Sequence, residues 1–155
     1  MKEYDIFLCS SIVEFKDERQ KLSAYIQNLN RISRKRFDTA VYLHKCEYMD
    51  NALTADGMQK TYNAEICRSE LVIFLFGEKA GEYTLEELAC AAEHFSESRR
   101  NKICILCRNN PYHADEGSSL RELAQMLDKY RMPWVQLYNI DSIKLAVAEK
   151  LFEQL

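Results

Sequence analysis

The segment Leu71–Phe76 places six apolar residues, LVIFLF, in one unbroken run. A strand with one face in water alternates apolar and polar residues, so a continuous run predicts a strand that is covered on both faces, as in a parallel sheet. Four further apolar segments of similar length are spaced along the chain. They are Tyr4–Cys9, Thr39–His44, Ile103–Cys107 and Trp134–Tyr138.

Amphipathic helical patterns separate these segments. Their apolar residues are Phe15, Leu22, Ile26 and Leu29, then Leu85, Leu88, Ala92 and Phe95, then Leu120, Leu123 and Leu127, and finally Ile143, Val147 and Leu151 after Asp141 as the expected N-cap. The alternation of strands and helices predicts an α/β fold, with an open parallel sheet and helices on both faces. Five strands in 155 residues suit the flavodoxin-like strand order 2-1-3-4-5, and we expect a single domain over residues 1–155.

The composition disfavours two classes of partner. Lys and Arg number 21 against 24 Asp and Glu, a net charge of −3, which leaves no excess of positive charge to neutralise nucleic-acid phosphates. No apolar run approaches the roughly 20 residues that cross a bilayer. We therefore expect neither nucleic acid nor a membrane as a partner. Most of the six cysteines lie in apolar stretches, as buried thiols do, which predicts a reduced protein in the cytoplasm.

The sequence offers no pattern for a metal site or a resident cofactor. Cys104 and Cys107 are three residues apart on an expected strand, so their side chains point to opposite faces and do not chelate one metal. The three histidines are scattered, without zinc-ligand spacing. The dinucleotide fingerprint GxGxxG and the phosphate loop GxxxxGK[ST] are both absent.

In a sheet of this order, ligands bind beyond the carboxyl ends of the strands, near the point where the strand order reverses. Three loops are expected there: Ser10–Glu14, Gly77–Thr84 and Lys45–Asp56. Ser10 and Ser11 precede a helix and offer hydroxyls to a ribose or an anion, or else they only cap that helix.

Glu87 allows two interpretations. A helix beginning near Thr84 makes Thr84-x-x-Glu87 a capping box, in which the carboxylate only reaches back to the backbone. Alternatively, the Glu87 carboxylate lies in the first turn above the strand ends and faces the crevice, with Tyr83 as an aromatic wall of the same pocket.

Three segments carry a family resemblance. Tyr4–Ser11 (YDIFLCSS) runs from an aromatic residue through Asp into an apolar strand that ends in Ser. The sequence YNAEICRSELVIFLFG leads from an amphipathic helix through Ser into the apolar run, and Tyr83–Leu88 reads YTLEEL. In order and spacing these segments resemble TIR (Toll/interleukin-1 receptor) domains, in which YTLEEL corresponds to a Trp-x-x-x-Glu-Leu box. They are most similar to the TIR-like domains of bacterial defence or stress-response proteins.

The resemblance implies an NAD+ glycohydrolase that cleaves the bond between nicotinamide and ribose and releases ADP-ribose in a linear or cyclic form. It implies that Glu87 is the catalytic carboxylate and that Tyr83, in the place of the family's Trp, stacks on a base. It further implies that Ser10 and Ser11 contact ribose or phosphate and that Lys45 approaches the pyrophosphate. NAD+ is then the substrate, with no cofactor and no metal, and TIR–TIR self-association activates the enzyme.

Two alternatives remain open. The same fold serves non-catalytic TIR adaptors, which bind partners without turnover, and nucleoside deoxyribosyltransferases combine a flavodoxin-like core with a catalytic Glu. The second box of this chain has Ala55-Asp56-Gly57 where the family usually has Pro-Gly. The last helical pattern extends to Leu155, which is compatible with a domain excised from a longer protein.

Overall fold

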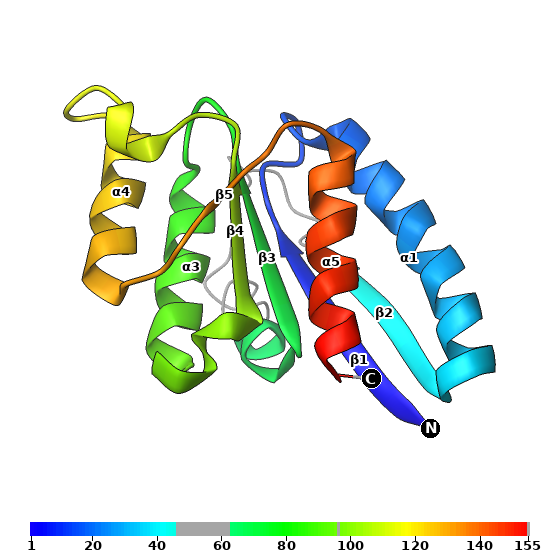
Figure 1. The fold of residues 1–155 in the computed structure, drawn as a ribbon. Coiled ribbons are helices and arrows are strands. Elements are labelled where there is room, and N and C mark those ends of the chain that lie inside the picture. Colours follow the sequence, from blue (N-terminus) through cyan, green and yellow to red (C-terminus); the bar gives the residue numbers. More distant parts are fainter. Residues whose placement is uncertain (46–62, 96, 155) are drawn as a thin grey trace.

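The computed structural model describes residues 1–45, 63–95 and 97–154. Five strands form one parallel sheet in the order β2-β1-β3-β4-β5 (Figure 1). The strands are β1 (Lys2–Cys9), β2 (Thr39–Lys45), β3 (Leu71–Phe76), β4 (Ile103–Cys107) and β5 (Val135–Gln136). The flavodoxin-like α/β fold predicted from the alternation of strands and helices is therefore confirmed.

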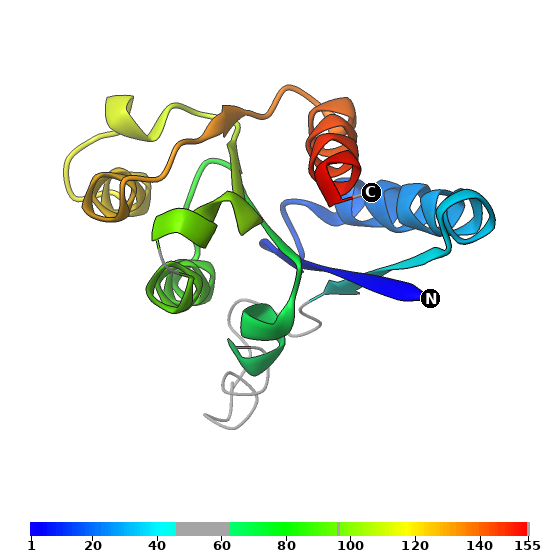
Figure 2. The same ribbon diagram turned by 60° about the horizontal axis from the view of Figure 1, so that its bottom comes forward.

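Helices cover both faces of this sheet. The longer ones are α1 (Lys16–Phe37), α3 (Glu82–His94), α4 (Ser119–Tyr130) and α5 (Ile140–Gln154), and the short 3₁₀ helices are η1 (Glu97–Lys102) and η2 (Pro111–His113). Residues 63–68 are also helical. Helices α1 and α5 pack on one face, while α3 and α4 pack on the other, as the turned view in Figure 2 shows. No helix in the described ranges is both long enough and apolar enough to cross a bilayer.

All six residues of β3 are buried, which confirms the interpretation of the LVIFLF run. Phe74 and Phe76 pack toward α3 and α4, whereas Ile73 and Leu75 pack toward α1 and α5. Strand β4 shows the same division, since Cys107 belongs to the first cluster and Cys104 to the second. The two thiols thus lie on opposite faces of the sheet, as their spacing predicted.

Two helix starts differ from the sequence-based prediction. Helix α3 begins at Glu82, and its N-cap residue is Gly81. Since glycine has no side chain, Gly81 supplies no side-chain capping hydrogen bond at this helix start. The predicted capping box of Thr84 and Glu87 is therefore wrong, because Thr84 already lies inside the first turn. Helix α5 begins at Ile140 rather than after Asp141.

The start of α5 is fixed by a different side chain from the one expected. Asn139 Oδ1 accepts a hydrogen bond from the Asp141 backbone N–H at 2.8 Å, so Asn139 takes the capping position. Strand β5 is also shorter than the predicted Trp134–Tyr138, because it pairs only Val135 and Gln136 with β4. As an edge strand it has one hydrogen-bonded neighbour, and pairing rather than apolar content decides its length.

Candidate functional site

A cavity of about 550 Å³ opens beyond the carboxyl ends of β1, β3 and β4. Its lining residues follow those three strands: Ser11, Val13, Glu14, Glu78, Arg108 and Asn109. Strand β1 has β2 on one side and β3 on the other, so the order of the strands reverses at β1. The cavity lies at this reversal point, where ligands of such sheets bind. The predicted loops Ser10–Glu14 and Gly77–Thr84 both border it. The contribution of β4 through Arg108 and Asn109 was not predicted.

Arg108 is held in place by three neighbours from the start of α1. Its Nη2 donates to Glu18 Oε1, and its Nη1 lies 3.9 Å from Glu14 Oε1. The guanidinium carbon lies 4.5 Å from the centre of the Phe15 ring, which is a cation–π distance. The guanidinium plane is thus fixed at the floor of the cavity, with about a third of the side chain exposed to a ligand or to water.

Glu14 connects the loop after β1 to the loop after β3. Its Oε1 accepts a hydrogen bond from the Glu78 backbone N–H at 2.8 Å. To reach this position the carboxylate passes over Gly77, where a Cβ atom would lie 1.6 Å from Oε1. Glycine at position 77 therefore allows the Glu14 carboxylate to pass close to the backbone. The hydrogen bond from Glu78 to Glu14 then holds the chain segment that leads into α3.

The two predicted serines lie in different environments. Ser11 lines the cavity, and its Oγ accepts a hydrogen bond from the Glu14 backbone N–H at 3.2 Å. Ser10 is only 4% exposed, and its Oγ accepts a hydrogen bond from Arg19 Nη1 at 3.1 Å. Ser11 is thus accessible from the cavity, whereas Ser10 faces α1.

Lys45 also contacts α1. Its Nζ donates to Ser23 Oγ at 3.0 Å, and the Ser23 hydroxyl in turn donates to the Arg19 carbonyl at 3.0 Å. Ser10 and Lys45 thus meet the same helix one turn apart, at the carboxyl ends of β1 and β2. The rest of the predicted loop Lys45–Asp56, beyond Lys45, lies outside the described residues, and so does the Ala55-Asp56-Gly57 segment.

Glu87 lies on the inner face of α3 and is 2% exposed. Leu88, Ala91 and Thr84 are buried on the same face of the helix. Counted from the true start of α3 at Glu82, Glu87 belongs to the second turn and not to the first. Tyr83 lies four residues before it, so the two side chains share one side of the helix, and Tyr83 is half-buried.

The surroundings of Glu87 include a pair of thiols. The Sγ atoms of Cys90, one turn further along α3, and Cys67, in the helical residues 63–68, are 4.0 Å apart. Burial above all, then the Cys67 thiol and the charges of Glu93 and Glu87, raise the pKa of the Cys90 thiol to about 11. The Glu87 carboxylate therefore lies close enough to the Cys90 thiol to raise its pKa, and the burial of Glu87 leaves that carboxylate poorly solvated.

The structure brings the predicted site residues together only in part. Ser11 borders the cavity at the strand ends, Glu87 and Tyr83 lie on α3, and Ser10 and Lys45 contact α1. Within the described ranges, no group of three or more His, Cys, Asp or Glu side chains is arranged to hold a metal ion. The sequence placed Glu14 at the end of the predicted loop Ser10–Glu14 but gave it no role, and it did not predict Arg108 at the site, although a charged residue directly after an apolar strand, as in ICILCR, is a signal for this edge of the sheet.

Comparison with known proteins adds little to this description. No family model matches the chain, and no curated protein matches it either. A solved structure that does match is a protein from P. pentosaceus named NADPH-quinone reductase. It is 11% identical, the match covers 98% of this chain and 97% of that chain, and the TM-score is 0.34. A similarity of this size carries no information about activity.

Proposed function

We propose that this chain is a TIR-type NAD+ glycohydrolase, which cleaves the bond between nicotinamide and ribose. The observation that carries the proposal is the burial of Glu87 at 2% exposure, in the second turn of α3 rather than at its capping position. Burying a carboxylate opposes folding, and such groups gather at functional sites. The YTLEEL segment that resembles the family's catalytic box contains this glutamate.

The proposed chemistry needs one well-placed negative charge. As the C1′–N bond breaks, its electron pair passes to the nicotinamide nitrogen, and positive charge develops on the ribose. The Glu87 carboxylate stabilises this charge and accepts hydrogen bonds from the ribose hydroxyls, as glycosidase carboxylates do. Water then adds to C1′ and loses a proton, which gives ADP-ribose, or the adenine base adds instead and gives a cyclic product.

The other predicted residues take supporting roles in this proposal. Tyr83, on the same side of α3 as Glu87, stacks on a base of the substrate. Ser11 contacts a ribose or phosphate from the cavity, and Lys45 approaches the pyrophosphate at the end of β2. Ser10 reaches the substrate only by exchanging its hydrogen bond from Arg19. Self-association of the domain in the cytoplasm activates turnover, in a bacterial defence or stress response.

The test is the consumption of NAD+ by concentrated protein, with chromatography of nicotinamide and the ADP-ribose products. Glu87→Gln keeps the size and shape of the side chain and removes the charge. We expect it to lower turnover about 10²- to 10³-fold, the usual effect of losing one stabilising group in the transition state. Glu93→Gln is the matched control, because Glu93 is an exposed carboxylate of the same helix and the amide keeps an acceptor for the Tyr130 hydroxyl.

Three results would contradict the proposal. Turnover that survives in Glu87→Gln assigns the chemistry to another group. Binding of NAD+ without turnover, at every concentration of the parent protein, favours the adaptor alternative. Turnover of nucleosides in preference to NAD+ favours an enzyme of the deoxyribosyltransferase type. In each case circular dichroism of both variants shows whether the fold is intact.

A further inference from the structure

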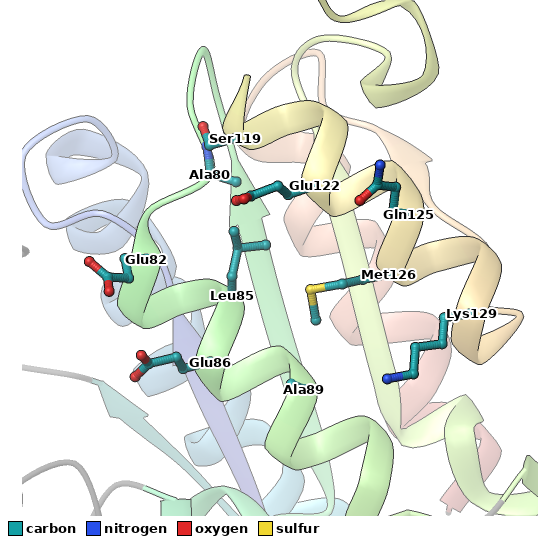
Figure 3. Close-up of a pocket in the computed structure, with 10 residues that line it drawn as sticks. All are labelled: Ala80, Glu82, Leu85, Glu86, Ala89, Ser119, Glu122, Gln125, Met126 and Lys129. Atoms are coloured by element: carbon teal, nitrogen blue, oxygen red, sulfur yellow. The ribbon is translucent and has the colours of Figure 1, made fainter. Parts of the chain in front are cut away.

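A groove of about 710 Å³ lies between α3 and α4. Leu85 from α3 and Met126 from α4 point toward one another across it, as Figure 3 shows. The full lining is Ala80, Glu82, Leu85, Glu86, Ala89, Ser119, Glu122, Gln125, Met126 and Lys129. Two of these lining residues, Ala80 and Ala89, have small side chains that leave space in the groove.

The rim of this groove is acidic. Glu82 and Glu86 stand on α3, Glu122 stands on α4, and Lys129 is the one cation among the lining residues. Three carboxylates against one ammonium give a formal charge of −2. The groove therefore suits a segment that presents apolar side chains between positive charges.

The last turns of α1 present such a segment. Ile32 is 44% exposed and Phe37 is 48% exposed. Arg31, Lys35 and Arg36 are exposed beside them. Ile32 shares one face of α1 with Lys35 and Arg36, three and four residues further on, whereas Phe37 lies about 140° around the helix from Ile32.

Several other exposed apolar side chains of the described residues have different surroundings. Val13 precedes Glu14, Phe37 precedes the exposed Asp38 and Phe152 precedes Glu153, so each of these apolar side chains stands beside a carboxylate that the groove would repel. Leu145 has one lysine next to it, Lys144. Ile32 instead shares its helix face with Lys35 and Arg36, and Arg31 and Arg34 are exposed in the same two turns, so this side of α1 is the complement of the groove.

The two surfaces lie on opposite sides of one molecule. Helix α1 covers the β2 edge of the sheet, whereas α3 and α4 lie toward β4 and β5 (Figure 1). A chain therefore does not place its own α1 in its own groove. We propose that the α3–α4 groove binds the C-terminal end of α1 from a second copy of this chain, with Ile32 entering between Leu85 and Met126 and with Lys35 and Arg36 on the same helix face meeting the acidic rim.

A contact of this kind is heterologous, because each copy uses two different surfaces. Such contacts repeat in one direction and build open chains unless the rotation between copies closes a ring. Self-association is part of the proposed function, but the choice of these surfaces rests on shape and charge alone. The test therefore measures assembly without NAD+, so that its failure and the failure of the enzymatic proposal are separate results.

The test exchanges the charges of the two surfaces and follows the molar mass by light scattering during size-exclusion chromatography. One variant carries Glu86→Lys and Glu122→Lys, which makes the groove basic. The other carries Lys35→Glu and Arg36→Glu, which makes the end of α1 acidic. Each variant alone then places like charges together, and we expect its association constant to fall at least about tenfold. A mixture of the two variants restores opposite charges at both kinds of contact, and we expect assembly to return.

The molar mass of the parent protein is measured at protein concentrations up to about 1 mM, so that a weak association is also detected. Lys16→Glu with Lys21→Glu is the control for charge, because it makes the same change on the exposed first half of α1. We expect this control to assemble like the parent protein. Thermal unfolding of each variant establishes that the fold is retained.

The proposal is overturned by a parent protein that stays monomeric at every concentration. It is equally overturned by charge variants that assemble like the parent, or by a mixture that remains monomeric while both variants are folded. Raising the salt concentration gives a further check, because about 1 M salt shortens the Debye length to about 3 Å. We expect assembly of the parent to weaken under these conditions.

Discussion

The contact between Glu14 and Gly77 makes a sharp prediction about stability. An alanine at position 77 places its Cβ 1.6 Å from Glu14 Oε1, so the carboxylate has to move away. The backbone at Gly77 does not have a positive φ, and alanine is therefore compatible with its conformation. The whole cost of Gly77→Ala then comes from the displaced glutamate, which loses its hydrogen bond from the Glu78 N–H.

The size of the effect follows from two opposing terms. A hydrogen bond to a charged group contributes about 1.5–3 kcal/mol, and partial exposure of the Glu14 side chain lowers this to about 1–2 kcal/mol because water replaces the lost partner. Replacing glycine by alanine lowers the entropy of the unfolded chain and stabilises the fold by about 0.4–1 kcal/mol. We therefore expect Gly77→Ala to destabilise the parent by about 0.5–1 kcal/mol, but to stabilise the Glu14→Ala variant.

The assay is a double-mutant cycle with urea unfolding of the parent, Gly77→Ala, Glu14→Ala and the double variant. The expected coupling energy is about 1–2 kcal/mol, well above the ~0.3–0.5 kcal/mol within which independent sites add. In thermal unfolding, 1 kcal/mol corresponds to a shift of about 2–4 °C for a chain of this length. Additive effects of the two substitutions would refute the reasoning, since they would mean that Glu14 does not lie over Gly77.

Two further predictions concern a helix end and a thiol. Asn139→Ala removes the N-cap of α5, so we expect it to lower the free energy of unfolding by about 0.5–2 kcal/mol. Asp141→Ala loses only an interaction with the helix dipole, which contributes about 0.3–1 kcal/mol. Urea unfolding that finds Asp141→Ala more destabilising than Asn139→Ala would contradict Asn139 as the cap. Burial raises the pKa of Cys107 to about 12, so iodoacetamide at pH 8 leaves Cys107 unmodified in the folded protein and alkylates it in urea. Mass spectrometry of the peptide that contains Cys107 measures the extent of alkylation. Equal labelling of the folded protein and of the protein in urea would exclude a buried thiol.

The inner strands are the part of the fold that the sequence predicts best. Strands β3 and β4 begin and end where their apolar runs do, at Leu71–Phe76 and Ile103–Cys107, because every residue in them is buried. The helix starts are predicted less well, since two neighbouring residues can each cap. Thr84 and Gly81 are both candidates for the N-cap of α3, and Asp141 and Asn139 are both candidates for the N-cap of α5. The backbone conformation decides which residue caps the helix, and the sequence does not show that conformation.

The candidate site divides in the same way. The positions of the loop that carries Ser11 and of the helix that carries Glu87 follow from the strand order, which the apolar pattern determines. The contacts of Glu14 and Arg108 do not follow, because they join residues far apart in the chain. Glu14 meets the Glu78 N–H across 64 positions, and Arg108 meets Glu18 across 90. A single sequence carries no record of such pairs, so only the folded chain reveals them.

Helix α3 links the two proposals, because it presents a different side to each. Glu86 and Glu87 are separated by about 100° of helical rotation, so the Glu86 carboxylate lines the groove between α3 and α4 while the Glu87 carboxylate is buried on another side of α3. A second copy bound in the groove would contact Glu86, Leu85 and the neighbouring α4 without covering Glu87. Such a contact would restrain the position of α3, while Glu87, the residue proposed for catalysis, lies on another side of the same helix. If both proposals hold, the assembly contact and the proposed catalytic carboxylate use different sides of one helix, so assembly would not block Glu87.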